Sequence, residues 1–221
     1  MDTKSNFRKF CKTSLLKQSK NYHIEKQVIN NALFDLFKDL KCKNILLYCP
    51  LDLEVNIFPL IFKLKAKGYK IFVPKITGIS FDVVEFSLPL IKNKYGILEC
   101  NNALKIPKID AMLVPILGID RTFRRIGFGK GMYDRFFASL KAKPKIIFIT
   151  KNLYFSQEIL TQNYDIKGDF LFCGKIGIKR NKNDNLYCSK LTNKWLSGRR
   201  NRLSYQQKNF LFQCSNHYRT S

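Results

Sequence analysis

The sequence predicts an α/β domain of three layers, in which helices flank a largely parallel central sheet, followed by a basic C-terminal tail. Short apolar runs that are typical of buried strands alternate along the chain with longer segments of helical periodicity, and strands linked by helices pair in parallel. The composition changes after Lys179, where apolar clusters become sparse. We therefore expect one domain over residues 1–179 and an extension over residues 180–221.

The first half of the chain contains three expected helices and three expected strands. In the second helix, apolar residues recur every four positions from Ile24 to Leu40, which gives the helix one apolar face. Gly68 is suited to end the third helix as a C-cap, and Pro74 is expected to close the strand that follows. In chain order, we expect helices at 4–18, 24–40 and 55–67, and strands at 44–48, 70–73 and, on the sheet edge, 81–86.

The second half contains two further apolar runs with a helical segment between them. The runs at 111–114 and 145–150 are short and continuous, as in strands that are buried on both faces. The helix expected at 132–140 opens directly after a cluster of glycines. This order of strand, helix and strand again favours a parallel sheet.

Charge is the strongest compositional feature. The 221 residues include 40 Lys and Arg against 16 Asp and Glu, a formal net charge of +24. Such an excess predicts anionic partners, namely nucleotide phosphates, a polyglutamate tail or nucleic acid. The alternative is a lysine-rich surface that is merely solvated, and charge alone does not separate these cases.

Several classes of protein are disfavoured by what the sequence lacks. No apolar run reaches the length of a membrane span, and the basic start has no apolar core of a secretory signal, so we expect a cytoplasmic protein. The seven cysteines are odd in number and include no C-x-x-C pair, which argues against a disulfide framework or a zinc site. With only two histidines, a histidine metal site or catalytic triad is poorly supported.

The extension is basic and polar. Residues 181–221 hold eight Lys or Arg and one acidic residue. We expect this segment to be disordered or to form a small helical addition, and to be dispensable for chemistry.

The most informative segment joins a buried strand to the helix at 132–140. Three glycines alternate at 127, 129 and 131, with Arg124, Arg125 and Lys130 around them. Alternating glycines allow positive φ and leave N–H groups uncovered, and a helix N-terminus adds its dipole. This arrangement suits a polyphosphate, although neither the Walker A spacing nor the dinucleotide fingerprint is present. A flexible basic turn is the alternative.

The string RIGFGKGMYD at 125–134 resembles the R-L-G-x-G-x-G-Y-Y-D signature of the 5-formyltetrahydrofolate cyclo-ligases. Other blocks similar to that family follow the same order along the chain, over roughly residues 4 to 175. They lie at 4–9, 48–55, 73–75, 95–99, 114–120 and 165–169. Met132 departs from the family's first tyrosine, and Cys100 stands in place of its proline.

The resemblance implies the ATP- and Mg²⁺-dependent closure of 5-formyltetrahydrofolate to 5,10-methenyltetrahydrofolate, with release of ADP and phosphate. It implies contacts to ATP from Lys4, Ser5, Asn6, Phe7, Arg8, Arg125, Ile126, Gly127, Phe128, Gly129, Lys130, Gly131, Met132 and Tyr133. It implies contacts to the folate from Cys49, Glu54, Phe128, Gly129, Lys130, Gly131 and Met132. Arg8, Arg125 and Lys130 would be catalytic, and Asp134 and Asp169 would hold Mg²⁺. A monomer or weak dimer acting on folate polyglutamates is expected.

Each of these roles has a structural alternative. Lys4 and Arg8 lie one helical turn apart and would form a solvated basic face. Asp134 would cap a helix, and Glu54 would be a first-turn glutamate of the helix at 55–67. At the level of the whole chain, the alternatives are a basic nucleic-acid-binding protein that uses the extension as an arm, and a sugar-phosphate or CoA enzyme on a similar scaffold.

Overall fold

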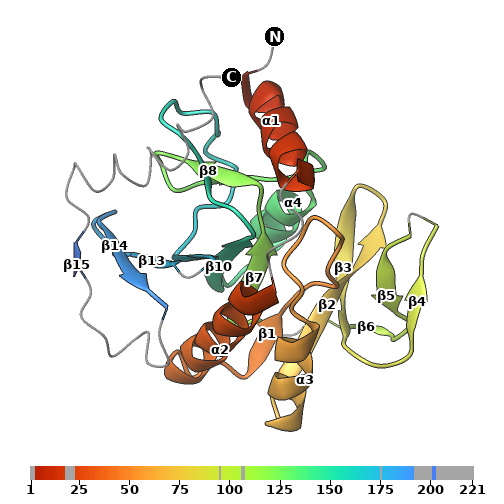
Figure 1. Ribbon diagram of the computed structural model, residues 1–221. Helices are drawn as coiled ribbons and strands as arrows, with labels where there is room; N and C mark the ends of the chain where they lie inside the picture. The colour runs from red at the N-terminus through yellow and green to blue at the C-terminus, as the bar shows by residue number, and fades with distance from the viewer. Residues whose placement is uncertain are drawn as a thin grey trace.

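The computed structural model describes residues 3–17, 23–94, 96–105, 108–174, 176–191 and 201–202 (Figure 1). Its helices are α1 (Thr3–Lys17), α2 (His23–Asp39), α3 (Phe58–Ala66) and α4 (Met132–Ser139). The central sheet runs β15 (Asn201–Arg202), β14 (Leu186–Lys190), β13 (Ile176–Arg180), β12 (Phe170–Cys173), β10 (Lys145–Thr150), β7 (Ala111–Pro115), β1 (Asn44–Leu46), β2 (Lys70–Thr77), β3 (Ser80–Glu85) and β6 (Leu104–Lys105). A small sheet joins β11 (Tyr154–Ser156), β8 (Gly118–Asp120) and β9 (Arg125–Ile126), and β4 (Leu90–Lys92) pairs with β5 (Leu98–Cys100).

The middle of the central sheet is parallel, as the alternation of strands and helices predicts. The strands β12, β10, β7, β1 and β2 pair in parallel, whereas the strands outside them pair antiparallel. From β1 the chain adds β2 on one side and later β7 on the other. Ligands in open α/β sheets bind at such a reversal, beyond the carboxyl ends of the strands. The topology therefore points to the ends of β1 and β7.

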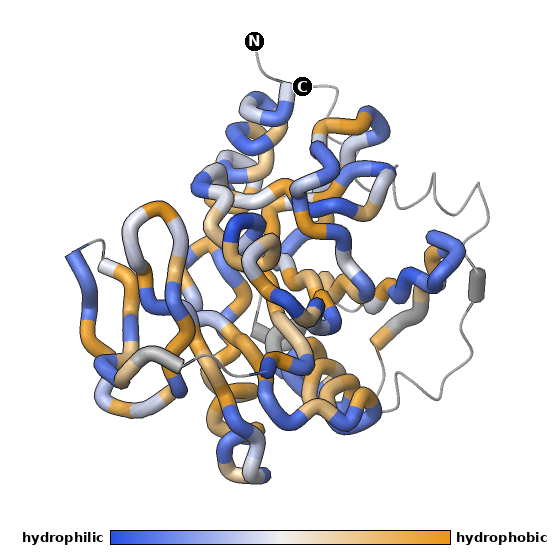
Figure 2. The backbone as a smooth tube through the Cα atoms, turned by 180° about the vertical axis from the view of Figure 1, so that it is seen from behind, coloured by the Kyte–Doolittle hydropathy of each residue, from blue (hydrophilic) through white to orange (hydrophobic). Residues whose placement is uncertain are grey.

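Helices cover both faces of this sheet, which confirms the three-layer prediction. Alternate residues of a strand point to opposite faces. Accordingly, Ile45 and Leu47 pack in a core with α2 and α3, whereas Leu46 packs in a second core bordered by α4. Figure 2 shows the hydrophobic segments gathered in the strands and in the helices packed against them.

The first helix packs against the small sheet rather than the central one. Cys11 and Leu15 of α1 are buried together with Leu117 and Tyr154. Figure 1 shows α1 above β8, on the side of the molecule where α4 begins. This docking brings the N-terminal helix close to the glycine loop, which we define as residues 127–131.

Proline explains two differences from the expected elements. The helix expected at 55–67 begins only at Phe58, because Pro59 lacks an N–H and is tolerated in the first turn but not deeper in a helix. The strand expected to stop before Pro74 continues to Thr77. The pairing of β2 with β1 ends at Phe72, so at Pro74 the neighbouring strand is the antiparallel β3. The missing N–H of Pro74 therefore removes no hydrogen bond to β1.

The sheet also continues past the expected end of the domain. The boundary placed at Lys179 falls inside β13, and β14 pairs antiparallel with it over 186–190. Leu191 is only 7% exposed and joins the core under α2 and α3. For residues 180–191, strands therefore replace the expected disordered or helical addition. Residues 192–200 and 203–221 lie outside the described residues. Within the described ranges, no helix has the length and apolarity needed to cross a membrane.

We predict that the start of the extension contributes to stability. Replacing buried Leu191 with alanine should lower the free energy of unfolding by about 2–5 kcal/mol, because the change leaves a cavity in the core. Leu16→Ala is the control, since Leu16 is 65% exposed on α1. Urea unfolding of both variants measures the difference. Equal stability of the two variants would show that the extension does not pack on the domain.

Candidate active site

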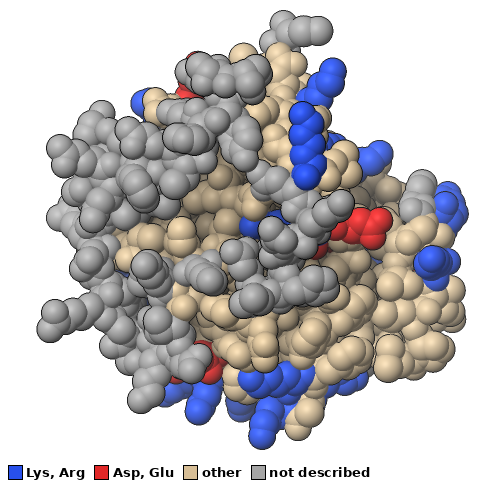
Figure 3. Space-filling view, viewed as in Figure 1, with Lys and Arg blue, Asp and Glu red and all other residues tan. Residues whose placement is uncertain are grey.

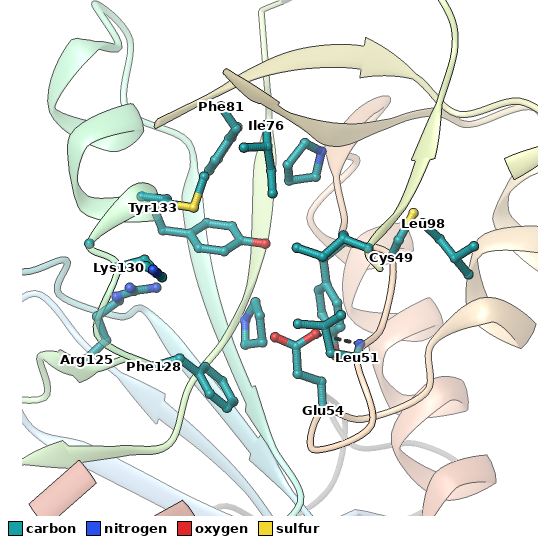
Figure 4. Close-up of a pocket in the computed structure, with 16 residues that line it drawn as sticks. Cys49, Leu51, Glu54, Ile76, Phe81, Leu98, Arg125, Phe128, Lys130 and Tyr133 are labelled. Atoms are coloured by element: carbon teal, nitrogen blue, oxygen red, sulfur yellow. Dashed lines mark hydrogen bonds between the residues drawn. The ribbon is translucent and has the colours of Figure 1, made fainter. Parts of the chain in front are cut away.

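A largely apolar cavity of about 220 Å³ lies at the carboxyl ends of β1, β2 and β7. Cys49 follows β1, Ile76 belongs to β2 and Pro115 ends β7, and all three line the cavity. Figure 4 shows the ring of Tyr133 reaching into it from α4, with Glu54 on the opposite wall. A cavity therefore lies where the order of the strands reverses, as the topology predicts.

A second, polar cavity of about 390 Å³ adjoins the first. Its wall includes five cationic side chains, from Lys4, Arg8, Arg125, Lys130 and Arg135. All three glycines of the glycine loop also line it. Arg125, Lys130 and Gly131 line both cavities, so the apolar and cationic spaces meet at these residues.

The glycine loop has the backbone geometry that its sequence predicts. Gly131 is the N-cap of α4 with φ of 62°, and Gly129 has φ of 116°, which is strained for any side chain. A Cβ on Gly127 would lie 2.4 Å from a terminal guanidinium nitrogen of Arg125. Two of the glycines are thus required by conformation and the third by close packing.

Arg125 lies between the two cavities and is only 4% exposed. Its Nε is 3.1 Å from Oδ1 of Asp134, in a contact of opposite charges without hydrogen-bond alignment. Its guanidinium carbon lies 5.3 Å from the centre of the Tyr133 ring. Asp134 also accepts a hydrogen bond from the Ile166 N–H at 3.1 Å. The site therefore holds a buried, paired guanidinium whose terminal nitrogens lie beside the glycine loop.

The first helix contributes two of the predicted cations to the polar cavity. Lys4 pairs with Asp165 at 2.6 Å, and Arg8 donates from Nε to the Gly127 carbonyl at 3.1 Å. Both side chains line the polar cavity together with the glycine loop. Their partners are more than a hundred residues away in the sequence. The alternative of a solvated basic face does not hold for this pair.

Glu54 is a half-buried carboxyl group that lines the apolar cavity. It lies in a loop before α3 and accepts a hydrogen bond from the Leu51 N–H at 3.0 Å, drawn as a dashed line in Figure 4. Burial raises its pKa to about 7, while the Leu51 hydrogen bond and the charges of Lys151 and Arg125 oppose the shift. Burial also raises the pKa of the neighbouring Cys49 thiol to about 12, so Cys49 lines the cavity as a neutral thiol.

The structure does not bring together the two aspartates that the sequence suggested for Mg²⁺. Asp169 accepts a hydrogen bond from the Ile146 N–H at 2.9 Å and pairs with Lys145 and Arg180, at the amino end of β10. That end is opposite to the cavities. Asp165, at the start of the same family block at 165–169, lines the polar cavity with Asp134 instead. Asp169 therefore lies away from both cavities.

Several other expected contacts fall outside the cavities. Ser5 and Asn6 are exposed, Phe7 packs in the core under α1, and Ile126 is fully buried in β9, and none of these side chains borders either cavity. The remaining predicted side chains line at least one cavity. Met132, the departure from the family tyrosine, lines the apolar one. Arg135 and Asp165 were not predicted as site residues, although Arg135 directly follows the signature string and Asp165 begins the block at 165–169.

The chain matches the 5-formyltetrahydrofolate cyclo-ligase family over residues 1–167. It is 26% identical over 122 residues to the 5-formyltetrahydrofolate cyclo-ligase of Haemophilus influenzae, covering 51% of this chain and 65% of that protein. It is 25% identical over 176 residues to the enzyme of the same name from Mycoplasma genitalium, covering 78% and 99% of the two chains. The NMR structure of Aquifex aeolicus 5,10-methenyltetrahydrofolate synthetase has the same fold, with a TM-score of 0.63, 24% identity and coverage of 89% and 94%.

We predict that Gly129 serves ligand binding more than folding. Gly129→Ala should cost roughly 1–3 kcal/mol of stability through backbone strain, yet lower turnover about a hundredfold by misplacing a bound phosphate. Gly68→Ala is the matched control, because Gly68 also has a positive φ and open space but lies after α3. Melting curves and ATP calorimetry distinguish the two effects. If Gly129→Ala binds ATP as tightly as the parent, the glycines form only a turn.

We also predict a pH-dependent cost of burying Glu54. Between its ordinary pKa of 4.5 and the folded value of about 7, the folded state holds the proton more tightly than the unfolded chain, so stability falls as pH rises. Glu54→Gln should therefore be about 1–3 kcal/mol more stable than the parent at pH 8 and equally stable at pH 4. Urea unfolding at both pH values measures this. A difference that is the same at both pH values would contradict the assignment.

Proposed function

The chain belongs to the 5-formyltetrahydrofolate cyclo-ligase family, and from this premise we propose that it catalyses the ATP-dependent closure of 5-formyltetrahydrofolate to 5,10-methenyltetrahydrofolate. The observation that carries the proposal is the junction of two cavities of opposite character at Arg125, Lys130 and Gly131. A reaction that joins a phosphate donor to an aromatic substrate needs both spaces side by side.

The polar cavity suits the triphosphate of ATP. Lys4 and Arg8 come from α1, Lys130 from the glycine loop and Arg135 from α4. Helix α4 begins there, directly after its N-cap Gly131, and the first N–H groups of the helix are uncovered. These groups can neutralise the phosphates without a dedicated nucleotide-binding domain.

The apolar cavity suits the pterin and the benzoyl ring of a reduced folate. Phe81, Phe128, Met132 and Tyr133 supply flat or adaptable apolar surface. Glu54 is the acidic side chain of that wall, and its carboxylate can accept from the amino and ring N–H donors of a pterin. Binding of these donors would favour the ionised form of Glu54.

The proposed chemistry needs little covalent help from the protein. The formyl oxygen attacks the γ-phosphorus, and ADP leaves. The nitrogen at position 10 then attacks the activated carbon and loses its proton to solvent, and phosphate departs with the former formyl oxygen. Arg8, Arg125 and Lys130 stabilise the charge on the phosphoryl group and hold it in line, which is the main requirement of phosphoryl transfer.

Mg²⁺ is part of the proposal, and the carboxylates of the polar cavity fit it. Among the described residues, the hydrogen bonds and ion pairs of these two carboxylates fall on Oδ1 of Asp134 and on Oδ2 of Asp165. The second oxygen of each carboxylate is thereby left for a cation. Mg²⁺ binds through one or two carboxylates together with phosphates and water, and it would neutralise phosphate charge there.

Polyglutamylated substrates and a cytoplasmic location complete the proposal. Figure 3 shows Lys and Arg side chains along α1 and below α2 and α3, a surface that would attract an anionic tail. The seven cysteines of the sequence are odd in number and include no C-x-x-C pair, which is typical of a protein from a reducing compartment. We propose a monomer or weak dimer.

The test is the absorbance of 5,10-methenyltetrahydrofolate formed by the purified protein from 5-formyltetrahydrofolate. Product should appear only when ATP and Mg²⁺ are present, with one ADP released per product. Absence of product under all conditions, from a protein that melts cooperatively, would contradict the proposal.

We predict that the two sequence-suggested aspartates behave differently. Asp134→Asn should lower turnover about a hundredfold, because Arg125 loses its charge partner and moves. Asp169→Asn should keep the turnover, since Asp169 lies at the amino end of the strands. The rates are compared at saturating Mg²⁺ and ATP, beside melting curves. An equal loss in both variants would mean that Asp169 acts at the site after all.

A further inference from the structure

Cationic side chains hold three backbone carbonyls of the glycine loop. Arg8 donates to the Gly127 carbonyl at 3.1 Å, and Lys12 donates from Nζ to the Phe128 carbonyl at 3.0 Å. Arg135 donates to the carbonyl of Lys130. An anion-binding loop must turn its N–H groups toward the anion and its carbonyl oxygens away, because a carbonyl oxygen facing a phosphate is repelled.

These bonds fix the direction of the N–H groups as well. In a trans peptide the carbonyl and the following N–H point to opposite sides. A bond from Lys12 to the Phe128 carbonyl therefore turns the Gly129 N–H away from Lys12. Gly129 lines the polar cavity, whereas Lys12 is not among the described residues that do. The peptide preceding a glycine rotates with little steric hindrance, so an external bond is needed to hold it.

We propose that Lys12 is a positioning residue, which orients the Phe128–Gly129 peptide so that the Gly129 N–H donates to a phosphate of ATP. The inference rests on the proposed function, because it assigns the polar cavity to ATP. Lys12 acts through the backbone and touches neither substrate. Arg8 and Arg135 hold carbonyls in the same way, but they also line the polar cavity. Replacing either one would therefore also remove a direct contact with the phosphates, and the two effects could not be distinguished.

The docking of α1 does not depend on Lys12. Cys11 is fully buried and Leu15 is 6% exposed, and both pack against Leu117 and Tyr154. Because this apolar contact anchors the helix, removal of the Lys12 ammonium should leave Lys4 and Arg8 in place. Lys12→Met keeps the apolar stem of the side chain and removes only the donor.

The experiment measures ATP and 5-formyltetrahydrofolate binding by calorimetry in the parent, in Lys12→Met and in Lys12→Arg. In Lys12→Met the dissociation constant for ATP should rise about tenfold, with the folate constant and the melting temperature unchanged. Lys12→Arg keeps a donor and should restore most of the ATP affinity. Lys9→Met is the control, since Lys9 is exposed on the same helix.

The outcomes separate this inference from the proposed function. A parent protein that binds no ATP would overturn the assignment of the polar cavity itself. If the parent binds ATP and Lys12→Met binds it equally well, the inference fails while the proposed function stands. Equal weakening of both ligands, or a Lys12→Arg variant as weak as Lys12→Met, would give Lys12 a structural role only and would also overturn the inference.

Discussion

The burial of the Arg125 guanidinium is the constraint on which the rest of the site depends. A buried charge needs a partner, and removing one member of such a pair typically costs about 3–5 kcal/mol. Asp134 supplies the partner from the first turn of α4, so the start of that helix is tied to β9. A Cβ at position 127 would lie against the same guanidinium, which is held by its pair with Asp134. One buried charge thereby favours a glycine at position 127 and fixes the start of α4.

The position of Arg125 also determines how the two cavities relate. Its side chain borders the apolar and the cationic cavity together with Lys130. The folate carbonyl and the terminal phosphate would therefore approach each other beside these two cations, with Glu54 on the far wall of the apolar cavity (Figure 4). The first helix closes the polar cavity from the other side, and its bonds to the loop carbonyls keep the loop N–H groups available.

Patterns with a strong physical cause were predictable from the sequence. Buried parallel strands need continuous apolar runs, and an anion-binding turn needs glycines before a helix, so both were found without a structure. The choice between Asp165 and Asp169 was not predictable, because both lie at irregular or terminal positions where no periodicity indicates direction. Strand β14 is short and follows the polar run 181–185, and its pairing with β13 comes from tertiary context. Lys12 looked like any other lysine of a basic helix.

The central claim is that the junction at Arg125 brings the γ-phosphate of ATP to the formyl oxygen of the folate. The most direct measurement uses 5-formyltetrahydrofolate labelled with ¹⁸O in the formyl group, followed by mass spectrometry of the released phosphate after a single turnover. We predict that the label is recovered in the phosphate. Label recovered in water instead, with unlabelled phosphate, would show that ATP hydrolysis and ring closure are separate events and that the phosphoryl group does not pass to the formyl oxygen.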